Sequence, residues 1–445
     1  MAQFSLDSCE SHKQQAALEE DLGHGSVDMI AIQPHPVWEE PNEGKATQEV
    51  LARLLVKQFE VHPWLKNPHL MTVLAEYWPR NLSGLPQATE RLFEVAAGTW
   101  LLAKCHWQEM PRWHPTLVLV HGLEGSSESR YMLGIAGKAF ATGLNVLRMN
   151  QRSCGSTEHL TPTLYESGLS GDYRAVLDEL VKKDGLPEIF FGGYSMGGNL
   201  VMKMAGEFGT HPPPELRGVC AVCPSLDLAA SSEASDQTRN LLYKWDFLWR
   251  FKRRMHRKAR LFPERYHDAG LWRLRTMHEW HDAITAPACG YLDAADYYHR
   301  ASALRVVDQI RVPTLILAAQ DDPIIPIPSF RYPGIVTNPF ITVVTPEYGG
   351  HCGFVSSNSG DERFWAEQRL VEFCVHQSMI FGSDHSNACS TVLKVPSGRR
   401  QNRDLPEIEF AEHHGNSGIH LRCFPGRFTG GKEFVYSNET KRKRR

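Results

Sequence analysis

Apolar runs and amphipathic stripes alternate along most of the chain. Continuous apolar runs, typical of strands buried on both faces, lie within residues 115–129, 144–152, 187–195, 216–225, 312–326 and 340–354. Stripes with helical spacing lie at 129–143, 169–185, 196–209 and 361–377. Two short strand-like runs separated by "AAG" predict a hairpin within 91–107. The alternation indicates an α/β fold, with a mostly parallel central sheet and helices on both faces.

This alternation stops between residues 226 and 305, a stretch rich in Trp, Arg, His and Tyr. We interpret it as a helical cap inserted into one α/β domain that spans 59–377. Residues 1–58 are polar and predict a loosely ordered extension. Residues 378–445 are rich in Ser, Asn, Gly and Arg, lack a sustained period, and predict a disordered tail outside the fold.

Composition excludes several classes of protein. The 445 residues carry a formal net charge of −3, without the basic excess of a nucleic-acid-binding protein. The N-terminus lacks the features of a signal peptide, and no run of about 18 apolar residues predicts a transmembrane helix. The ten cysteines are scattered, and the pair Cys220 and Cys223 lies in an apolar run that reads as a buried strand. We therefore expect reduced thiols in a cytoplasmic protein.

The segment "FGGYSMGGNL" (191–200) contains the pattern Gly-x-Ser-x-Gly at Gly193, Ser195 and Gly197. It follows an apolar strand and opens an amphipathic helix, which is the context of a strained turn that exposes a nucleophilic serine. The helix N-terminus also favours a developing negative charge. The competing interpretation is a glycine-rich helix start with Ser195 as its N-cap.

A nucleophilic serine needs a histidine as general base and a carboxylate that orients the histidine. In this arrangement the chain order is serine, acid, histidine. Asp321 and Asp322 follow the strand in 312–326, and His351 follows the last strand, after two glycines. We assign the acid to Asp322, with Asp321 as the alternative. The backbone N–H groups of Leu123 and Met196 are the candidates for an oxyanion hole.

Together these segments resemble the AB-hydrolase 4 (YheT-like) family of the α/β-hydrolases. The resemblance extends from about Phe59 to Gln377 and rests on "NPHLMT", "HGLEGSSESRY", "NQRSCGSTE", "SGLSGDYRAVL", "GYSMGGNLVMK", "DDP" and "GGHCGF". It implies an α/β-hydrolase fold with Ser195, one of the two aspartates and His351 as a triad. This chain has Arg152-Ser153-Cys154-Gly155 where the family has Arg-Gly-Cys-Gly, and it lacks the N-terminal membrane helix of animal members.

We expect a serine hydrolase that cleaves carboxylic esters through an acyl-enzyme, without a metal or an organic cofactor. The resemblance also implies lipid esters among the substrates, and acyl transfer to an alcohol by the same triad as the alternative. A third interpretation is a non-catalytic binding protein on a hydrolase scaffold. It predicts the loss of a triad member, and all three candidates are present.

Residues 245–260 interleave aromatic and basic side chains, in "WDFLWRFKRRMHRKAR". One interpretation is a cap helix with its aromatic side on the core and its basic side in water. The other is that this segment covers the Ser195 pocket, offers its apolar face to acyl chains, and brings the protein to anionic lipid as a peripheral membrane contact.

Overall fold

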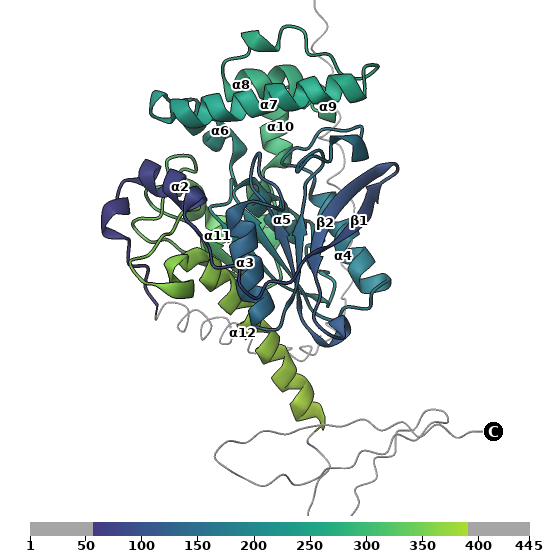
Figure 1. The fold of residues 1–445 in the computed structure, drawn as a ribbon, viewed down its shortest axis with the longest axis vertical. Helices are drawn as coiled ribbons and strands as arrows, with labels where there is room; N and C mark the ends of the chain where they lie inside the picture. Colours follow the sequence, from purple (N-terminus) through teal and green to yellow (C-terminus); the bar gives the residue numbers. More distant parts are fainter. Residues whose placement is uncertain (1–56, 390–445) are drawn as a thin grey trace, which may run out of the picture. The chain divides into compact units, whose positions relative to one another are not determined.

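The apolar runs form the centre of an eight-stranded sheet in the computed structural model (Figure 1). The strand order is β1-β2-β4-β3-β5-β6-β7-β8, with β1 and β2 antiparallel to their neighbours and the other pairs parallel. The strands are β1 Thr89–Ala96, β2 Thr99–His106, β3 Thr116–Val120, β4 Asn145–Met149, β5 Ile189–Tyr194, β6 Leu216–Val222, β7 Thr314–Leu317 and β8 Ile341–Val344. This confirms the predicted hairpin and the mostly parallel sheet.

The structure describes residues 57–389, with side chains up to residue 379. Predictions for residues 1–56 and 390–445 lie outside the described residues. The last described helix, α12 (Trp365–Cys389), begins four residues after the predicted start of 361 and continues past 377. It crosses the domain end that we expected at 377.

Helices pack on both faces of the sheet, as the alternation predicted. On one face, α4 (Ser170–Lys182) and α5 (Met196–Phe208) contribute to a large apolar core with β3, β5 and β6. On the other face, α3 (Arg130–Ala141) and α12 pack against the same strands. Every residue of β3 and β5 is buried, which explains why these strands are apolar throughout instead of alternating.

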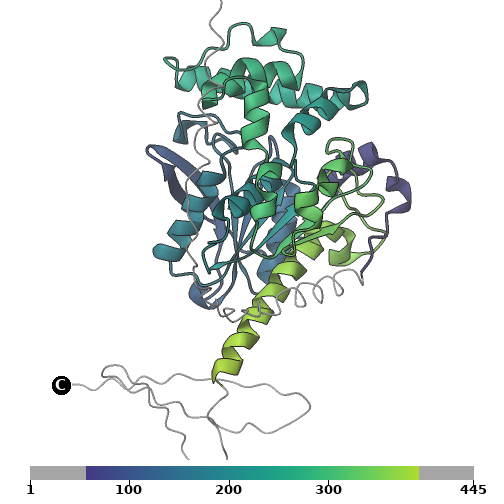
Figure 2. The ribbon, with the colours of Figure 1, turned by 180° about the vertical axis from the view of Figure 1, so that it is seen from behind.

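The segment between β6 and β7 forms a group of helices beyond one end of the strands (Figures 1 and 2). Its α-helices are α6 Leu228–Asp236, α7 Leu241–Leu261, α8 Met277–Trp280, α9 Ala286–Cys289 and α10 Ala294–Ala301. A separate apolar cluster, centred on Leu248, Phe251 and Trp280, holds α7 against α8. We call this helical group the cap.

The strand β7 is shorter than the apolar run that predicted it. Its ladder ends at Leu317, and Ala318 and Ala319 continue as buried backbone to the turn at Asp321 and Asp322. The apolar character of 312–326 therefore reflects burial on both sides of the turn. A short helix, α2 (Pro68–Tyr77), precedes the hairpin, and the side chain of the preceding Asn67 caps its N-terminus.

Candidate active site

Ser195 occupies the sharp turn between β5 and α5. Its backbone adopts φ 53° and ψ −117°, a conformation that residues with a side chain rarely adopt. The Ser195 N–H donates to Val222 O at 2.9 Å, which ties the turn to the end of β6. The hydroxyl forms no capping bond to the helix, so the structure argues against Ser195 as a simple N-cap.

Close packing explains the glycines around this turn. A Cβ atom at Gly193 would collide with the backbone of Gly197, and a Cβ at Gly197 would collide with the carbonyl groups of Val120 and His121. The start of α5 thus packs directly against β5 and the end of β3. Side chains at these two positions would push the turn away from the sheet.

A hydrogen-bonded chain connects Ser195, His351 and Asp322. Ser195 Oγ lies 2.9 Å from His351 Nε2, and His351 Nδ1 lies 2.8 Å from Asp322 Oδ2. The Asp322 side chain is 1% exposed, and its other oxygen accepts the N–H groups of Ile324 and Ile325 at 2.8 and 2.9 Å. Because a carboxylate only accepts, Nδ1 carries a proton and a neutral His351 presents a free Nε2 lone pair to Ser195.

The neighbouring Asp321 has a different position. Its Oδ1 accepts the N–H of Gly350 at 2.8 Å, one residue before the histidine. The structure therefore places Asp322, and not Asp321, against the imidazole. Asp321 instead bonds the loop that carries His351.

The loop of His351 is fixed by α2, an element that the sequence did not connect with the site. The His351 N–H donates to Thr72 Oγ1 at 2.8 Å. Gly350 adopts φ 56°, and a Cβ there would lie 2.6 Å from Pro68 O. Close contact with α2 therefore accounts for the glycine at position 350. The "NPHLMT" segment was the available signal for Thr72.

The ionisation of His351 reflects two opposing effects. Burial is the largest single effect and disfavours the imidazolium, but Asp322 and Cys352 together outweigh it, and the pKa of His351 lies well above its ordinary value. The imidazolium is therefore strongly stabilised where a proton from Ser195 would arrive.

The two candidate oxyanion donors come from separate loops. Met196 is the first residue of α5, so its N–H has no acceptor within the helix. The loop after β3 carries Leu123, and a Cβ on the preceding Gly122 would lie 3.2 Å from Ser195 Cβ. The Gly122 N–H itself donates to Tyr131 Oη at 2.9 Å, which leaves the following residue as the candidate.

Buried hydrogen bonds set the position of the loop after β3. The His121 ring lies 2.7 Å from Gly122 O through Nδ1, and its Nε2 accepts the Gln151 N–H at 3.1 Å. Burial lowers the pKa of His121 to about 4, so the ring is neutral and keeps one tautomer. Sequence reasoning missed Gln151, although it lies in the quoted "NQRSCG" segment. Two residues on, Ser153 adopts φ 62°, a left-handed conformation that suits the glycine of the family pattern.

A narrow cavity of about 40 Å³ starts at the two oxyanion candidates and lies under the cap. It is lined by Leu123, Leu164, Tyr165, Glu166, Met196, Phe251, Arg254, Met255, Trp280, His281, Thr285 and Tyr297. Burial lowers the pKa of His281 to about 3 and raises that of Glu166 to about 7, so His281 is neutral and Glu166 is partly protonated at neutral pH. Arg254 is the charged group of this wall, and its guanidinium pairs with the Glu124 carboxylate at 2.8 Å. Most of the other lining side chains are apolar or aromatic. Such a lining suits an apolar group better than an ion.

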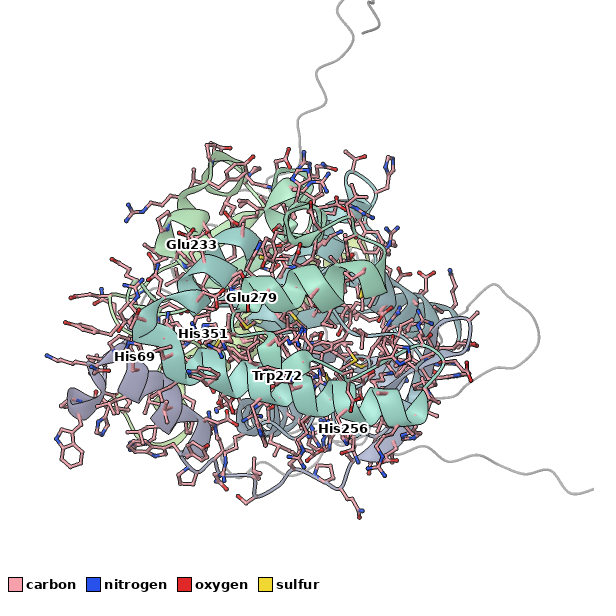
Figure 3. The ribbon with its side chains drawn as sticks, turned by 90° about the horizontal axis from the view of Figure 1, so that it is seen from above. His69, Glu233, His256, Trp272, Glu279 and His351 are labelled. Atoms are coloured by element: carbon pink, nitrogen blue, oxygen red, sulfur yellow. The ribbon has the colours of Figure 1, made fainter. Side chains whose placement is uncertain are left out.

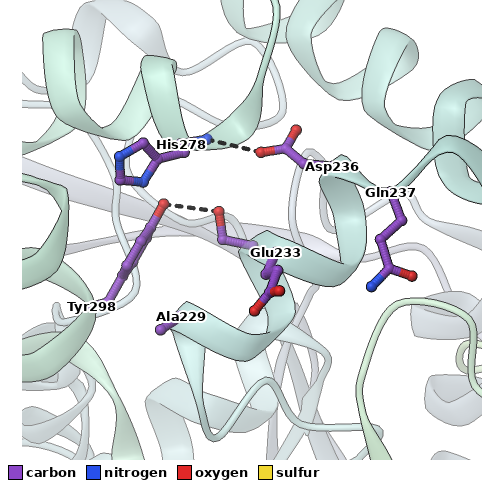
Figure 4. Close-up of a pocket in the computed structure, with 7 residues that line it drawn as sticks. Ala229, Glu233, Asp236, Gln237, His278 and Tyr298 are labelled. Atoms are coloured by element: carbon purple, nitrogen blue, oxygen red, sulfur yellow. Dashed lines mark hydrogen bonds between the residues drawn. The ribbon is translucent and has the colours of Figure 1, made fainter.

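A larger hollow of about 460 Å³ lies elsewhere in the cap, between α6, α8 and α10 (Figure 4). Glu233, Asp236, His278 and Tyr298 line it, and none of the triad candidates does. The Asp236 carboxylate accepts the N–H groups of Met277 and His278 and thereby caps α8. Of the two cavities, the smaller one borders the Ser195 turn, because Met196, the residue after Ser195, and the oxyanion candidate Leu123 line it.

The distribution of buried and exposed side chains on α7 differs from both interpretations of the sequence. Leu248 and Phe251 face inward, whereas Trp245 and Trp249 are 52% and 58% exposed. Two of the basic residues are buried: Arg254 pairs with Glu124 at 2.8 Å, and Lys258 donates to backbone carbonyl oxygens. The expectation of an aromatic core side and a basic water side is therefore only partly correct.

Among the described residues, one group of side chains is spaced to share a metal ion, and it consists of Cys223, His351 and Cys352. No helix in the described part is both long enough and apolar enough to cross a bilayer.

Comparison with known proteins agrees with this geometry. A family model for the alpha/beta hydrolase fold matches residues 115–355. YheT of Escherichia coli, named provisionally as an esterase, is 30% identical over 312 residues, which cover 69% of this chain and 90% of YheT. A mouse protein named phospholipase ABHD3 is 26% identical, covering 60% of this chain and 62% of its own.

A yeast protein named medium-chain fatty acid ethyl ester synthase/esterase 2 is 26% identical, covering 58% of this chain and 61% of its own length. The residues matched by the family model include both the turn of Ser195 and the loop of His351. The chain belongs to the YheT-like, AB-hydrolase 4 branch of the alpha/beta hydrolase family.

Proposed function

We propose that this protein hydrolyses carboxylic esters through Ser195, His351 and Asp322. The observation that carries the proposal is the hydrogen-bonded chain from Ser195 Oγ through both nitrogens of His351 to Asp322 Oδ2. The strained turn of Ser195 supports it, because such strain persists where the surrounding structure fixes it for function. The relatives named as an esterase, a phospholipase and an ester synthase/esterase support the same class of reaction.

The proposed reaction has two steps. Ser195 Oγ attacks the ester carbonyl while its proton passes to His351 Nε2, and the N–H groups of Leu123 and Met196 stabilise the oxyanion. The imidazolium then protonates the leaving alcohol, which gives the acyl-enzyme. Water attacks that ester next, with His351 again accepting and returning the proton.

The cavity under the cap supports an apolar acyl group as the part of the substrate that is bound. Its volume of about 40 Å³ has room for only a few water molecules, which is too little for a long acyl chain in the present arrangement. The cap helices would have to separate from the loop of Leu123 before a long chain could enter. Short and medium acyl groups are therefore the first substrates to test.

The test is a series of p-nitrophenyl esters of increasing acyl length, together with labelling by a fluorophosphonate probe. Labelling of Ser195 and hydrolysis that depends on chain length would support the proposal. Product analysis with an added alcohol would separate hydrolysis from acyl transfer, which the name of the yeast relative suggests. An intact protein that neither reacts with the probe nor cleaves any ester would favour the non-catalytic interpretation.

We also propose that the enzyme meets its substrate at a lipid surface. Large apolar side chains are exposed along α2 and α7, and these define the α2–α7 surface: Leu70, Val73, Leu74, Tyr77, Leu242, Trp245 and Trp249. The two helices lie beside each other, since the ring of His69 on α2 stacks on the ring of Tyr243 on α7. His69 Nδ1 also lies 3.2 Å from Tyr243 Oη. Figure 3 shows His69 and His351 close to this junction.

Basic side chains lie among these apolar groups. Arg250, Arg253 and Arg260 are exposed on α7, and the Arg253 guanidinium lies 5.3 Å from the centre of the Trp249 ring. Exposed aromatic groups with interspersed cations suit a membrane surface, where apolar acyl chains lie beneath anionic head groups. Because Thr72 of α2 bonds the backbone of His351, this surface borders the proposed active site.

We expect the protein to sediment with phosphatidylcholine vesicles that contain phosphatidylserine, and less with phosphatidylcholine alone. High salt should weaken binding, since exposed charges are screened over about 10 Å at 0.1 M. Replacing both Trp245 and Trp249 by serine should reduce binding at least tenfold, because an inserted large apolar side chain contributes about 1.5–3 kcal/mol.

The matched control is Trp113→Ser, because Trp113 is 80% exposed but lies before β3, away from α2 and α7. It should bind vesicles like the wild type. Equal binding to both kinds of vesicle, or binding to neither, would contradict the lipid-surface proposal and favour a small dissolved ester.

The pH dependence of kcat/KM is a separate prediction. His351 must be neutral to accept the Ser195 proton, and its pKa is raised by Asp322. Activity should therefore fall as the pH decreases through a value above the ordinary histidine pKa of about 6.5. In Asp322→Asn, the fall of the residual kcat/KM should occur at a lower pH than in the wild type. The reason is that the neutral amide no longer stabilises the imidazolium.

Asp321→Asn is the control, since Asp321 bonds the loop and not the imidazole. It should leave the acid side of the pH profile unchanged. A wild-type profile that loses activity only below pH 6.5, or one that Asp322→Asn does not move, would contradict this account of His351.

A further inference from the structure

Two cysteines lie against the proposed catalytic histidine. Cys223 follows the last residue of β6, and Cys352 follows His351 directly. Both adopt left-handed backbone conformations, with φ 45° and φ 62°, which are uncommon for residues other than glycine. Cys223 lies three residues after Cys220 in the sequence, but in the fold it contacts Cys352.

Hydrogen bonds hold the two thiols between their loops. The Cys352 N–H donates to Cys223 Sγ at 3.4 Å. The Cys223 thiol in turn lies 3.9 Å from Gly350 O, and the Cys352 thiol lies 3.7 Å from Val222 O. Each sulfur therefore contacts the loop that carries the other cysteine.

One atom from each of Cys223, Cys352 and His351 lies within 4.8 Å of the other two. Zinc bonds of about 2.3 Å to sulfur and 2.0–2.1 Å to imidazole nitrogen place tetrahedral ligands about 3.4–3.8 Å apart. A contraction of at most about 1.0–1.4 Å between ligand atoms would close the group around one ion. Two thiolates and an imidazole suit a soft or borderline ion such as Zn²⁺ or Cd²⁺, and they disfavour Mg²⁺ and Ca²⁺.

We propose that Cys223, Cys352 and His351 form a site for a thiophilic divalent cation, and that its occupation by zinc inhibits the enzyme reversibly. Both nitrogens of His351 are already engaged, one by Ser195 and the other by Asp322. A metal bond to either nitrogen must displace one of these hydrogen bonds. The ion and the proposed triad therefore compete for the same imidazole.

Binding is a ligand exchange without redox chemistry. The two thiols lose their S–H protons to solvent as two zinc–sulfur bonds form, and the imidazole lone pair forms the third bond. Water fills the fourth position. Removal of the ion by a chelator restores both thiols and the hydrogen bonds of His351.

The experiment uses the full chain, reduced and free of metal. Titration calorimetry should detect one high-affinity Zn²⁺ per chain, and Cd²⁺ should produce thiolate charge-transfer absorption. Cys223→Ser and Cys352→Ser should each weaken zinc binding more than about tenfold. Cys289→Ser is the matched control, because Cys289 is partly exposed like Cys352 but lies in the cap.

Inhibition rests on the proposed ester hydrolysis, whereas binding does not. Ser195→Ala should bind zinc at least as tightly as the wild type, because it lacks one of the hydrogen bonds that compete for His351. Since this variant hydrolyses nothing, a failure of the proposed function would leave the binding test intact. In the active enzyme, zinc should reduce hydrolysis and EDTA should restore it. In mass spectrometry, zinc should also protect Cys352 of the wild type from alkylation, which needs no variant to fold.

Zinc affinity that is unchanged in both cysteine variants would overturn the proposal, as would alkylation of Cys352 that zinc does not slow. Inhibition that only a thiol reductant reverses would also overturn it. That result would indicate a disulfide between Cys223 and Cys352 instead of a metal site.

Discussion

Replacing Ser195 by alanine is expected to lower kcat for ester hydrolysis by about 10⁴–10⁶-fold while the protein remains folded. The substitution removes the only atom that the proposed mechanism uses to form the acyl-enzyme. It leaves the buried glycine contacts of the turn unchanged, because these involve backbone atoms. Steady-state kinetics with the best p-nitrophenyl ester, with circular dichroism and thermal melting in parallel, will measure both effects.

Ser225→Ala is a matched control for this experiment. Ser225 is a buried serine in the loop after β6, and its N–H donates to Ser195 O at 3.3 Å, but its hydroxyl is outside the hydrogen-bonded chain to Asp322. Its kcat should stay within about tenfold of the wild type. If Ser195→Ala kept more than a few per cent of the activity, the nucleophile would have to be another residue.

The fold could be predicted from the sequence because burial on both faces makes parallel strands apolar throughout. The runs at 144–152 and 187–195 became β4 and β5 with boundaries shifted by only a few residues. The prediction was less accurate where burial and strand pairing do not coincide. In 312–326 the chain remains buried after its ladder ends at Leu317, so an apolar run alone could not locate the end of β7.

The proposed site was predictable in its chain order but not in its supporting contacts. Ser195, Asp322 and His351 each follow a strand, and parallel strands bring such positions to one edge of the sheet. Thr72 and Cys223 come from segments that no local pattern connects with His351. Their contacts depend on how α2 and the end of β6 meet the histidine loop, which is a property of tertiary packing.

The cap shows the same limit. Helical spacing in 245–260 predicted a helix, and α7 covers it. The side chains that face inward could not be deduced, because the partner of a cap helix is not defined by its own sequence. Arg254 is buried since Glu124 lies opposite it, and Trp249 is exposed since no described helix covers it.

The second large effect is expected from Asp322→Asn, which should lower kcat by about 10⁴-fold, as the loss of the orienting carboxylate does in other Ser-His-Asp hydrolases. Asp322 Oδ1 accepts two backbone N–H groups, from Ile324 and Ile325, and Oδ2 faces His351 Nδ1. An asparagine will keep its oxygen on the two N–H donors, so its NH₂ group will face Nδ1. The histidine must then carry its proton on Nε2, where it cannot accept the proton of Ser195.

Asp321→Asn should have a much smaller effect, within about tenfold, because an amide oxygen can still accept the Gly350 N–H that Asp321 Oδ1 accepts now. Comparing kcat and the rate of fluorophosphonate labelling in the two variants will rank the aspartates. The labelling rate should fall together with kcat in Asp322→Asn, since both reactions need an activated Ser195. The reverse ranking would move the orienting role to Asp321, and equally small effects in both variants would remove the carboxylate from the mechanism.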